Sequence, residues 1–243
     1  MGPFLLYRIP HAVKRVRAAP IAAALVLIAC GTLFGENPLD WLSRVRRAAG
    51  VPGVQADALL SLTAEDYARR LASRGMLSHK GDDGSSALDR YRALGGTEVR
   101  VGEILGAGPA AGLVQEAWMA SAEHRQVALA PEWTHAGWGS AAAGTSVVVV
   151  MLFTRKLVVG LELQSGTAVF SARGRFLPVY AAAPVLINGL DEVAPSAWEP
   201  ESRSFVFEVP RSSLEGYLRL GFRTADGSFT LTNAFSPVGG PGR

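Results

Sequence analysis

The chain divides into two parts that differ in the spacing of their apolar residues. From Asp40 to about Ser121 the apolar positions recur every three or four residues, which is the spacing of amphipathic helices. After Pro131 they alternate with polar residues or form continuous runs, as they do in strands. Helices followed by strands predict an α+β protein.

The first part has the start and stop signals of four helices. Gly75 ends the longest amphipathic stretch, and the spacing of Ser86 and Asp89 is that of a capping box. Pro109 suits the first turn of a further helix. We predict helices over residues 40–48, 56–74 and 87–94, and from Pro109 through Met119.

The remaining segments predict two groups of strands. Residues 136–141 and 146–153 follow the helices, and the sequence SVVVVMLF at 146–153 is apolar on both faces, which is typical of a central strand. Beyond Lys156 the apolar runs are short and predict a small, Ig-like β-sandwich. Its expected strands are 157–163, 167–176, 184–187, 203–209, 216–222 and 228–235. We therefore place the domains at residues 38–155 and 156–243.

The N-terminal segment has the pattern of an export signal. A basic stretch precedes the short apolar run IAAALVLIA at 21–29, which is shorter than the 20 or so residues that span a bilayer. The residues Leu27 to Cys30 resemble a bacterial lipobox, in which the cysteine is lipidated after cleavage. We predict a signal peptide over 1–29, lipidation at Cys30 and a linker over 30–37. The alternative is a retained anchor with an incidental cysteine.

The charge of the chain is concentrated in this leader. The whole sequence has 243 residues and a formal net charge of +3, and residues 1–29 hold four Lys or Arg and no acid. The remainder thus has a net charge of −1. Because no basic cluster with interleaved aromatic residues follows, we expect no nucleic-acid partner.

Few residues in the mature chain have obvious catalytic chemistry. With Cys30 lipidated, no thiol is left as a nucleophile, and the common local motifs of hydrolases, zinc proteases and nucleotide enzymes are absent. Its three histidines are His79, His124 and His135. His79, Glu103 and His124 lie about 20 residues apart, so spacing alone predicts separate groups rather than one site.

Taken in order, several short motifs resemble the CAP superfamily of cysteine-rich secretory proteins, antigen 5 and pathogenesis-related proteins, in particular its bacterial branch. They are Ser78-His79, the segment Gly102-Glu103-Ile104-Leu105 where the family has Gly-Glu-Asn-Ile, the Trp-x-x-Ser-x-x-His-Arg pattern of 118–125, and Ala136-Gly137-Trp138-Gly139. The resemblance covers about residues 38–154. It implies an α-β-α sandwich with a ligand cleft.

The resemblance also implies a site. Carried over by position, His79, Glu103 and His124 match cleft residues that hold a divalent metal in some members of the family. Ser121 stands where eukaryotic members have Glu, and Glu123 is a substitute of the same charge. Two imidazoles and one carboxylate are a ligand set for zinc or another divalent cation. The alternative is a hydrogen-bonded polar cluster in which Glu103 pairs with a histidine.

These observations lead to one function and two rivals. We expect an exported envelope lipoprotein, anchored in a membrane through Cys30 and facing the periplasm or the cell exterior, whose cleft binds a small-molecule, lipid or peptide ligand. One rival is a metal-assisted hydrolase of peptide or cell-wall substrates, in which His79, Glu103 and His124 activate water. The other is a purely structural envelope protein. Asp82, Asp83 and Ser85 are expected to stabilise their loop, and His135 to be an exposed residue that starts a strand.

Overall fold

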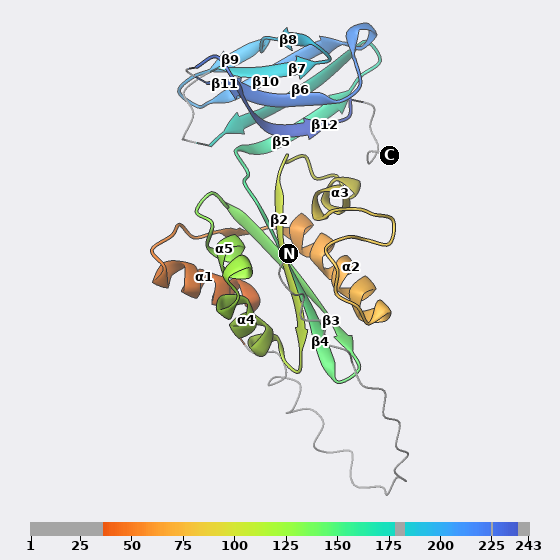
Figure 1. Ribbon diagram of the computed structural model, residues 1–243. Coiled ribbons are helices and arrows are strands. Elements are labelled where there is room, and N and C mark those ends of the chain that lie inside the picture. Colours follow the sequence, from red (N-terminus) through yellow and green to blue (C-terminus); the bar gives the residue numbers. More distant parts are fainter. Residues whose placement is uncertain (1–35, 178–182, 225, 238–243) are drawn as a thin grey trace, which may run out of the picture.

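The structure is a computed structural model that describes residues 36–177, 183–224 and 226–237. The predicted signal peptide, the lipidation site at Cys30 and most of the linker after it lie outside the described residues. Figure 1 shows a helix-and-sheet part below a part made of strands. None of the helices in the described ranges is both long enough and apolar enough to cross a membrane.

All four predicted helices are present, and three of them begin with side-chain caps that the sequence supplies. Asp57 caps the longest helix by accepting a hydrogen bond from the Leu60 amide. Ser86 and Asp89 form the expected capping box at the start of the next helix. Gly75 ends the longest helix with φ of 63°. The four are α1 (Pro38–Ala48), α2 (Ala58–Arg74), α3 (Ala87–Ala93) and α4 (Ala111–Ala120).

Two details of the helical prediction were wrong. Helix α4 begins at Ala111, so Pro109 precedes the helix rather than occupying its first turn. A further helix, α5 (Ala122–Leu129), follows immediately, because Ser121 takes an extended conformation and caps the new helix. His124 therefore lies in the first turn of α5 instead of after a helix.

A four-stranded mixed sheet lies between the helices. It contains β1 (Gln55–Ala56), β2 (Val101–Gly108), β3 (His135–Ala143) and β4 (Ser146–Thr154), in the order β1-β3-β4-β2. Strand β1 runs parallel to β3, and the other pairs are antiparallel. The central position of β4 confirms the prediction made from its continuous apolar run. Strand β2 was not predicted, because its three glycines and Glu103 interrupt any alternation.

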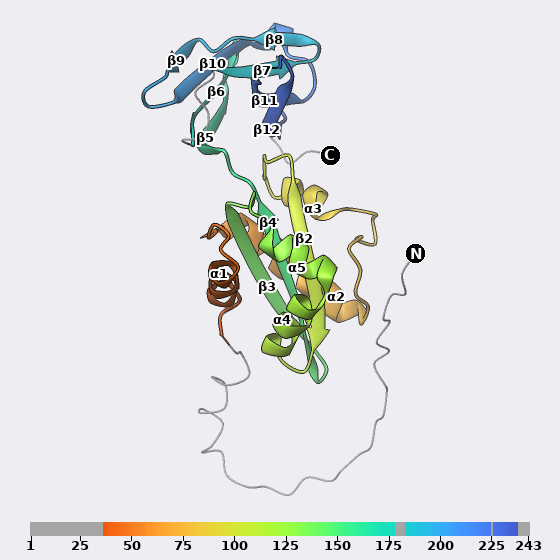
Figure 2. The same ribbon diagram turned by 60° about the vertical axis from the view of Figure 1, so that its left-hand side comes forward.

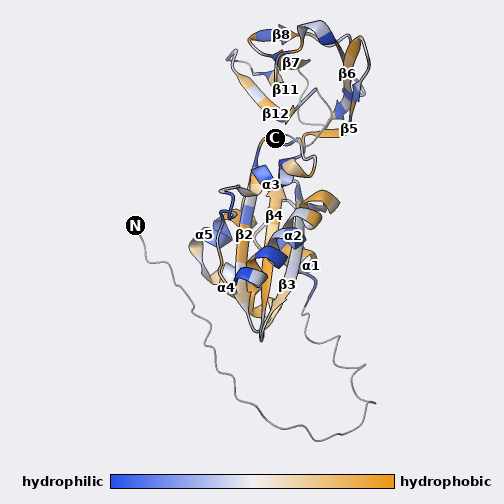
Figure 3. Ribbon diagram, turned by 90° about the vertical axis from the view of Figure 1, so that its right-hand side faces the viewer, coloured by the Kyte–Doolittle hydropathy of each residue, from blue (hydrophilic) through white to orange (hydrophobic). Residues whose placement is uncertain are grey.

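Both faces of the sheet are covered, which confirms the expected α-β-α sandwich. Val149, Met151 and Phe153 of β4 pack with α1, α4 and α5, whereas the even-numbered residues of the same strand pack with α2 and α3. The turned view in Figure 2 shows α4 and α5 in front of the sheet. Figure 3 shows apolar colour along the strands and polar colour on parts of the helices.

The strands beyond Lys156 form a β-sandwich. The strands are β5 (Val158–Ser165), β6 (Val169–Phe176), β7 (Pro184–Asn188), β8 (Asp191–Val193), β9 (Ala197–Glu199), β10 (Ser204–Pro210), β11 (Leu218–Arg223) and β12 (Phe229–Phe235). Their sheets, β5-β6-β10-β9 and β12-β11-β7-β8, enclose an aromatic-rich core. All six predicted strands are present, and β8 and β9 are additional. The two strand orders correspond to the ABED and GFC sheets of an Ig fold, extended by one strand, β8.

The two parts of the chain contact each other where the loop after α3 meets strand β12. The Ala234 amide donates to the Thr97 carbonyl at 2.7 Å, and the Asn233 side chain donates to the Thr97 hydroxyl at 2.8 Å. Within the connection, the Lys156 amide donates to the Thr134 hydroxyl at 2.7 Å. The loop after α3 is thus hydrogen bonded to β12.

Candidate functional site

His79 and Glu103 come from distant segments and meet at the edge of the helix-and-sheet part. The Nδ1 atom of His79 lies 2.7 Å from Oε1 of Glu103, which is in β2. A carboxylate only accepts hydrogen bonds, so Nδ1 carries the proton and Nε2 is left as the acceptor when the imidazole is neutral. The His79 side chain is 58% exposed, whereas that of Glu103 is 5% exposed.

Arg90 completes this cluster from α3. Its guanidinium forms an ion pair with Oε2 of Glu103, and both side chains are nearly buried. The same guanidinium lies 3.4 Å from the centre of the Tyr67 ring, in cation–π geometry. It also donates to the Ser85 carbonyl at 2.9 Å. The Glu103 carboxylate is therefore held from two sides.

Backbone contacts place His79 on this cluster. The Tyr67 hydroxyl donates to the Ser78 carbonyl at 2.7 Å, and burial raises the pKa of Tyr67, so the hydroxyl stays protonated. The loop that follows is held by two contacts. The Ser85 amide donates to the Asp83 carboxylate at 2.9 Å, and Asp82 forms an ion pair with Arg74 of α2 at 2.5 Å. Asp82, Asp83 and Ser85 thus have the loop-stabilising roles predicted for them.

His124 approaches the cluster from α5. Burial lowers its pKa, and His79 lowers it further through charge repulsion, so the two imidazoles are within electrostatic range. Its Nδ1 atom is buried and has no hydrogen-bond partner in the part of the chain that the structure describes. Ser121 orients the residue, because its hydroxyl accepts from the His124 amide at 3.5 Å.

The fold therefore brings His79 and Glu103 into contact, although they are far apart in the sequence, and it places His124 within electrostatic range of His79. Ser121 caps helix α5. Glu123 is exposed in the first turn of α5, and its charge acts to raise the pKa of His124. Sequence reasoning missed Arg90. No local signal marks it, since its role depends on α3 packing beside β2.

As placed, these residues do not fit a resident metal ion. Both oxygens of Glu103 are already bonded, one to the Arg90 cation and one to His79. Across the described ranges, no group of three or more His, Cys, Asp or Glu side chains is arranged to hold a metal. The arrangement corresponds to the alternative polar cluster, in which Glu103 pairs with a histidine. Metal binding by His79, Glu103 and His124 stays a prediction.

His135 occupies a different place from the one expected. It does start a strand, β3, but it is half-buried rather than exposed. The Thr134 hydroxyl lies 2.9 Å from Nδ1 of His135. Burial is the main cause of the lowered pKa of His135. His135 also lines a cavity together with Lys156 of the connection between the two parts, which sequence reasoning did not foresee.

A sandwich of helices around a mixed sheet, with His79 and Glu103 in contact at its edge, agrees with the architecture that the sequence motifs implied. Residues 39–153 match the model of the cysteine-rich secretory protein family, known as CAP. This segment is a CAP domain, and the β-sandwich is an addition to it.

Several solved structures are similar over this domain. An outer surface protein from Borrelia burgdorferi has 21% identity and a TM-score of 0.46, with 49% of this chain and 90% of that one covered. An extracellular SCP-domain protein from Bacillus anthracis has 19% identity and a TM-score of 0.45, with 49% and 39% covered. A cysteine-rich secretory protein from Staphylococcus aureus has 17% identity and a TM-score of 0.38, with 50% and 40% covered. No curated protein sequence matches the chain.

Proposed function

We propose that the chain is an exported envelope lipoprotein, anchored at Cys30, whose CAP domain binds a ligand at the cluster formed by His79, Glu103 and His124. The observation that carries the binding role is the buried Arg90–Glu103 pair that holds an exposed imidazole in a fixed orientation. An ion pair with so little exposure costs desolvation energy, and helix packing could be achieved with apolar residues instead. The ion pair positions His79 through Glu103, which explains why a buried pair occurs here.

The chemistry of the cluster favours binding over hydrolysis. In the described part of the chain, neither His79 nor His124 is hydrogen bonded through its ring to a Ser or Thr hydroxyl, so no nucleophile is paired with a base. What the cluster offers a ligand is the exposed ring of His79, whose Nε2 is an acceptor when the ring is neutral. The Nδ1 atom of His124 is buried and has no hydrogen-bond partner among the described residues. A small ligand with a hydrogen-bond donor would suit the exposed ring of His79.

Photo-cross-linking tests the binding role in living cells. A benzoylphenylalanine residue replaces Leu77, which is exposed and two residues before His79, and replaces Leu113 on α4 as a matched exposed control. We expect an adduct from position 77, reduced several-fold by His79→Ala or His124→Ala, and no such adduct from position 113. Equal adducts from both positions, or adducts that both histidine variants leave unchanged, would contradict binding at this cluster.

The anchor is tested by the Cys30→Ser substitution. Because lipidation requires the Cys30 thiol, we expect the parent chain to partition into detergent and the variant to lose membrane attachment or remain unprocessed. Fractionation followed by detergent phase separation measures both. If the variant stays as tightly membrane-bound as the parent, the leader is a retained helix.

Zinc titration tests the metal role separately. Since Arg90 and His79 already occupy the Glu103 carboxylate, we expect equally weak heats of zinc binding in the parent, in His79→Ala and in His124→Ala. Isothermal calorimetry makes the measurement at neutral pH, with His135→Ala as the matched control. Strong binding that both site variants abolish and the control retains would restore the metal site.

A further inference from the structure

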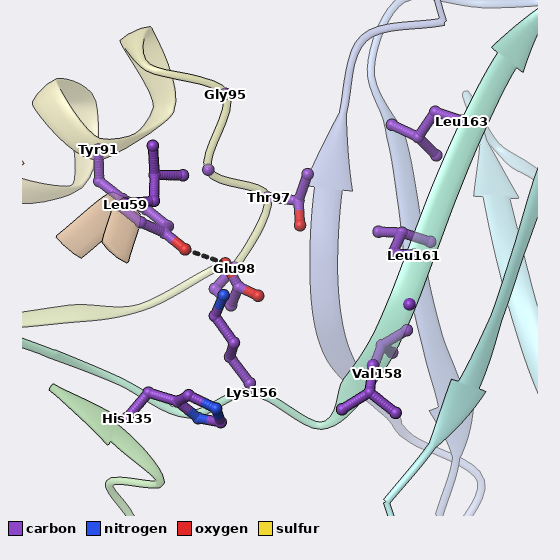
Figure 4. A pocket seen from close by; sticks show the side chains of 13 residues that line it. Leu59, Tyr91, Gly95, Thr97, Glu98, His135, Lys156, Val158, Leu161 and Leu163 are labelled. Atoms are coloured by element: carbon purple, nitrogen blue, oxygen red, sulfur yellow. Dashed lines mark hydrogen bonds between the residues drawn. The ribbon is translucent and has the colours of Figure 1, made fainter. Parts of the chain in front are cut away.

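A cavity that none of the cluster residues lines lies where the CAP domain meets the β-sandwich. It has a volume of about 430 Å³, which is within the range of pockets for small molecules. Tyr91, Glu98, His135 and Lys156 line one side. Figure 4 shows Val158, Leu161 and Leu163 of β5 on the opposite side.

The polar side of this junction cavity holds a carboxylate, Glu98, that forms no ion pair among the described residues. Lys156 is already paired with Asp57, since Nζ and Oδ2 are 2.5 Å apart. Glu98 is only 5% exposed, and in the described part of the chain its carboxylate accepts one side-chain hydrogen bond, from the Tyr91 hydroxyl at 2.5 Å. Burial and the nearby Glu98 both raise the pKa of Tyr91, which therefore remains a neutral donor.

A buried carboxylate with one neutral donor is poorly solvated, and a cation placed beside it forms a charge-assisted hydrogen bond in a medium of low dielectric constant. An anion would be repelled by the Glu98 carboxylate and would find no unpaired lysine, because Lys156 on the cavity wall is already paired with Asp57. The facing wall is aliphatic and buries apolar surface. The best match is therefore a molecule with a cationic head and an apolar body.

We propose that the junction cavity is a binding site for a small amphipathic amine, whose ammonium group pairs with Glu98 and whose apolar part packs on Leu161 and Leu163. The two walls come from different domains, so the ligand would bridge them. The loop that carries Glu98 is already fixed to β12 through Thr97, so the site is largely preformed.

Three probes of equal chain length test the proposal: n-hexylammonium, hexanoate and hexanol. Each is titrated into the ¹⁵N-labelled full chain in a nonionic detergent, and the amide signals of Gly95 and Gly160 at the cavity wall are followed by NMR. We expect saturable shifts with n-hexylammonium and binding at least about tenfold weaker for the other two. Equal binding of all three would mean apolar partitioning only and would overturn the proposal.

Variants separate the charge from the apolar wall. Glu98→Gln removes the charge at constant shape and should weaken n-hexylammonium binding about tenfold, whereas Tyr91→Phe keeps the carboxylate and should retain binding. Leu163→Asn should weaken binding, and the matched Leu113→Asn on α4 should not. If Glu98→Gln is misfolded by circular dichroism, the Leu163 and Leu113 pair decides the outcome. Unchanged binding in Leu163→Asn or in folded Glu98→Gln would refute the site.

Discussion

Replacing Gly139 by Ala is expected to destabilise the CAP domain by about 3 kcal/mol, at the upper end of the cost of overpacking a core. A Cβ atom at this position would lie within 3.0 Å of the backbone of Ala64 and Glu65, and one at Gly137 would meet the backbone at Leu60 and Ser61. The β3 glycines thus allow α2 to lie directly on the strand. Backbone atoms cannot rotate away as a side chain can, so the helix itself must move.

Urea unfolding followed by circular dichroism measures this effect, since α2 is the longest helix. Gly112→Ala is the matched control, because nothing lies within 4 Å of a Cβ there and the site is in α4. That change should stabilise the domain by up to about 1 kcal/mol, from the higher helix propensity of Ala. A Gly139→Ala variant as stable as the parent would mean that α2 does not touch β3 as described.

Replacing Arg90 by Met is expected to destabilise the domain by about 3–5 kcal/mol, the cost of leaving one partner of a buried ion pair unpaired. The affected partner is Glu103, whose side chain is 5% exposed. The stacking of the guanidinium on Tyr67 is lost as well. Thermal or urea unfolding of the full chain measures the change.

A double-mutant cycle distinguishes the ion pair from simple loss of packing. Combining Arg90→Met with Glu103→Leu removes both charges, so the double variant should regain part of the stability lost in either single variant. Arg69→Met is the control, because Arg69 is more than half exposed and pairs on the surface with Glu65. It should change stability by less than about 1 kcal/mol. Additive single effects would show that Arg90 and Glu103 do not interact.

The candidate site was predicted only in part. The motif order pointed to His79, Glu103 and His124. The structure shows a contact between His79 and Glu103, with His124 within electrostatic range of His79. Neither Arg90 nor the cap role of Ser121 could be deduced from spacing, because each depends on how α3 packs beside β2 or on where α4 stops. The same holds for the half-burial of His135 beside Thr134, Lys156 and Glu98, which lie far apart in the sequence.

The sequence by itself determined four of the helices, most of the strands and the two covered faces of β4. The continuous apolar run of β4 implied a strand covered on both sides, and Asp57, Gly75 and Ser86 marked helix ends, because these effects act within a few residues. Tertiary structure alone decided the ion pair at Glu103, the close approach of α2 to Gly137 and Gly139, and the junction cavity beside Glu98. Such contacts join residues far apart in the chain, and their energies depend on burial and distance, which no local pattern encodes.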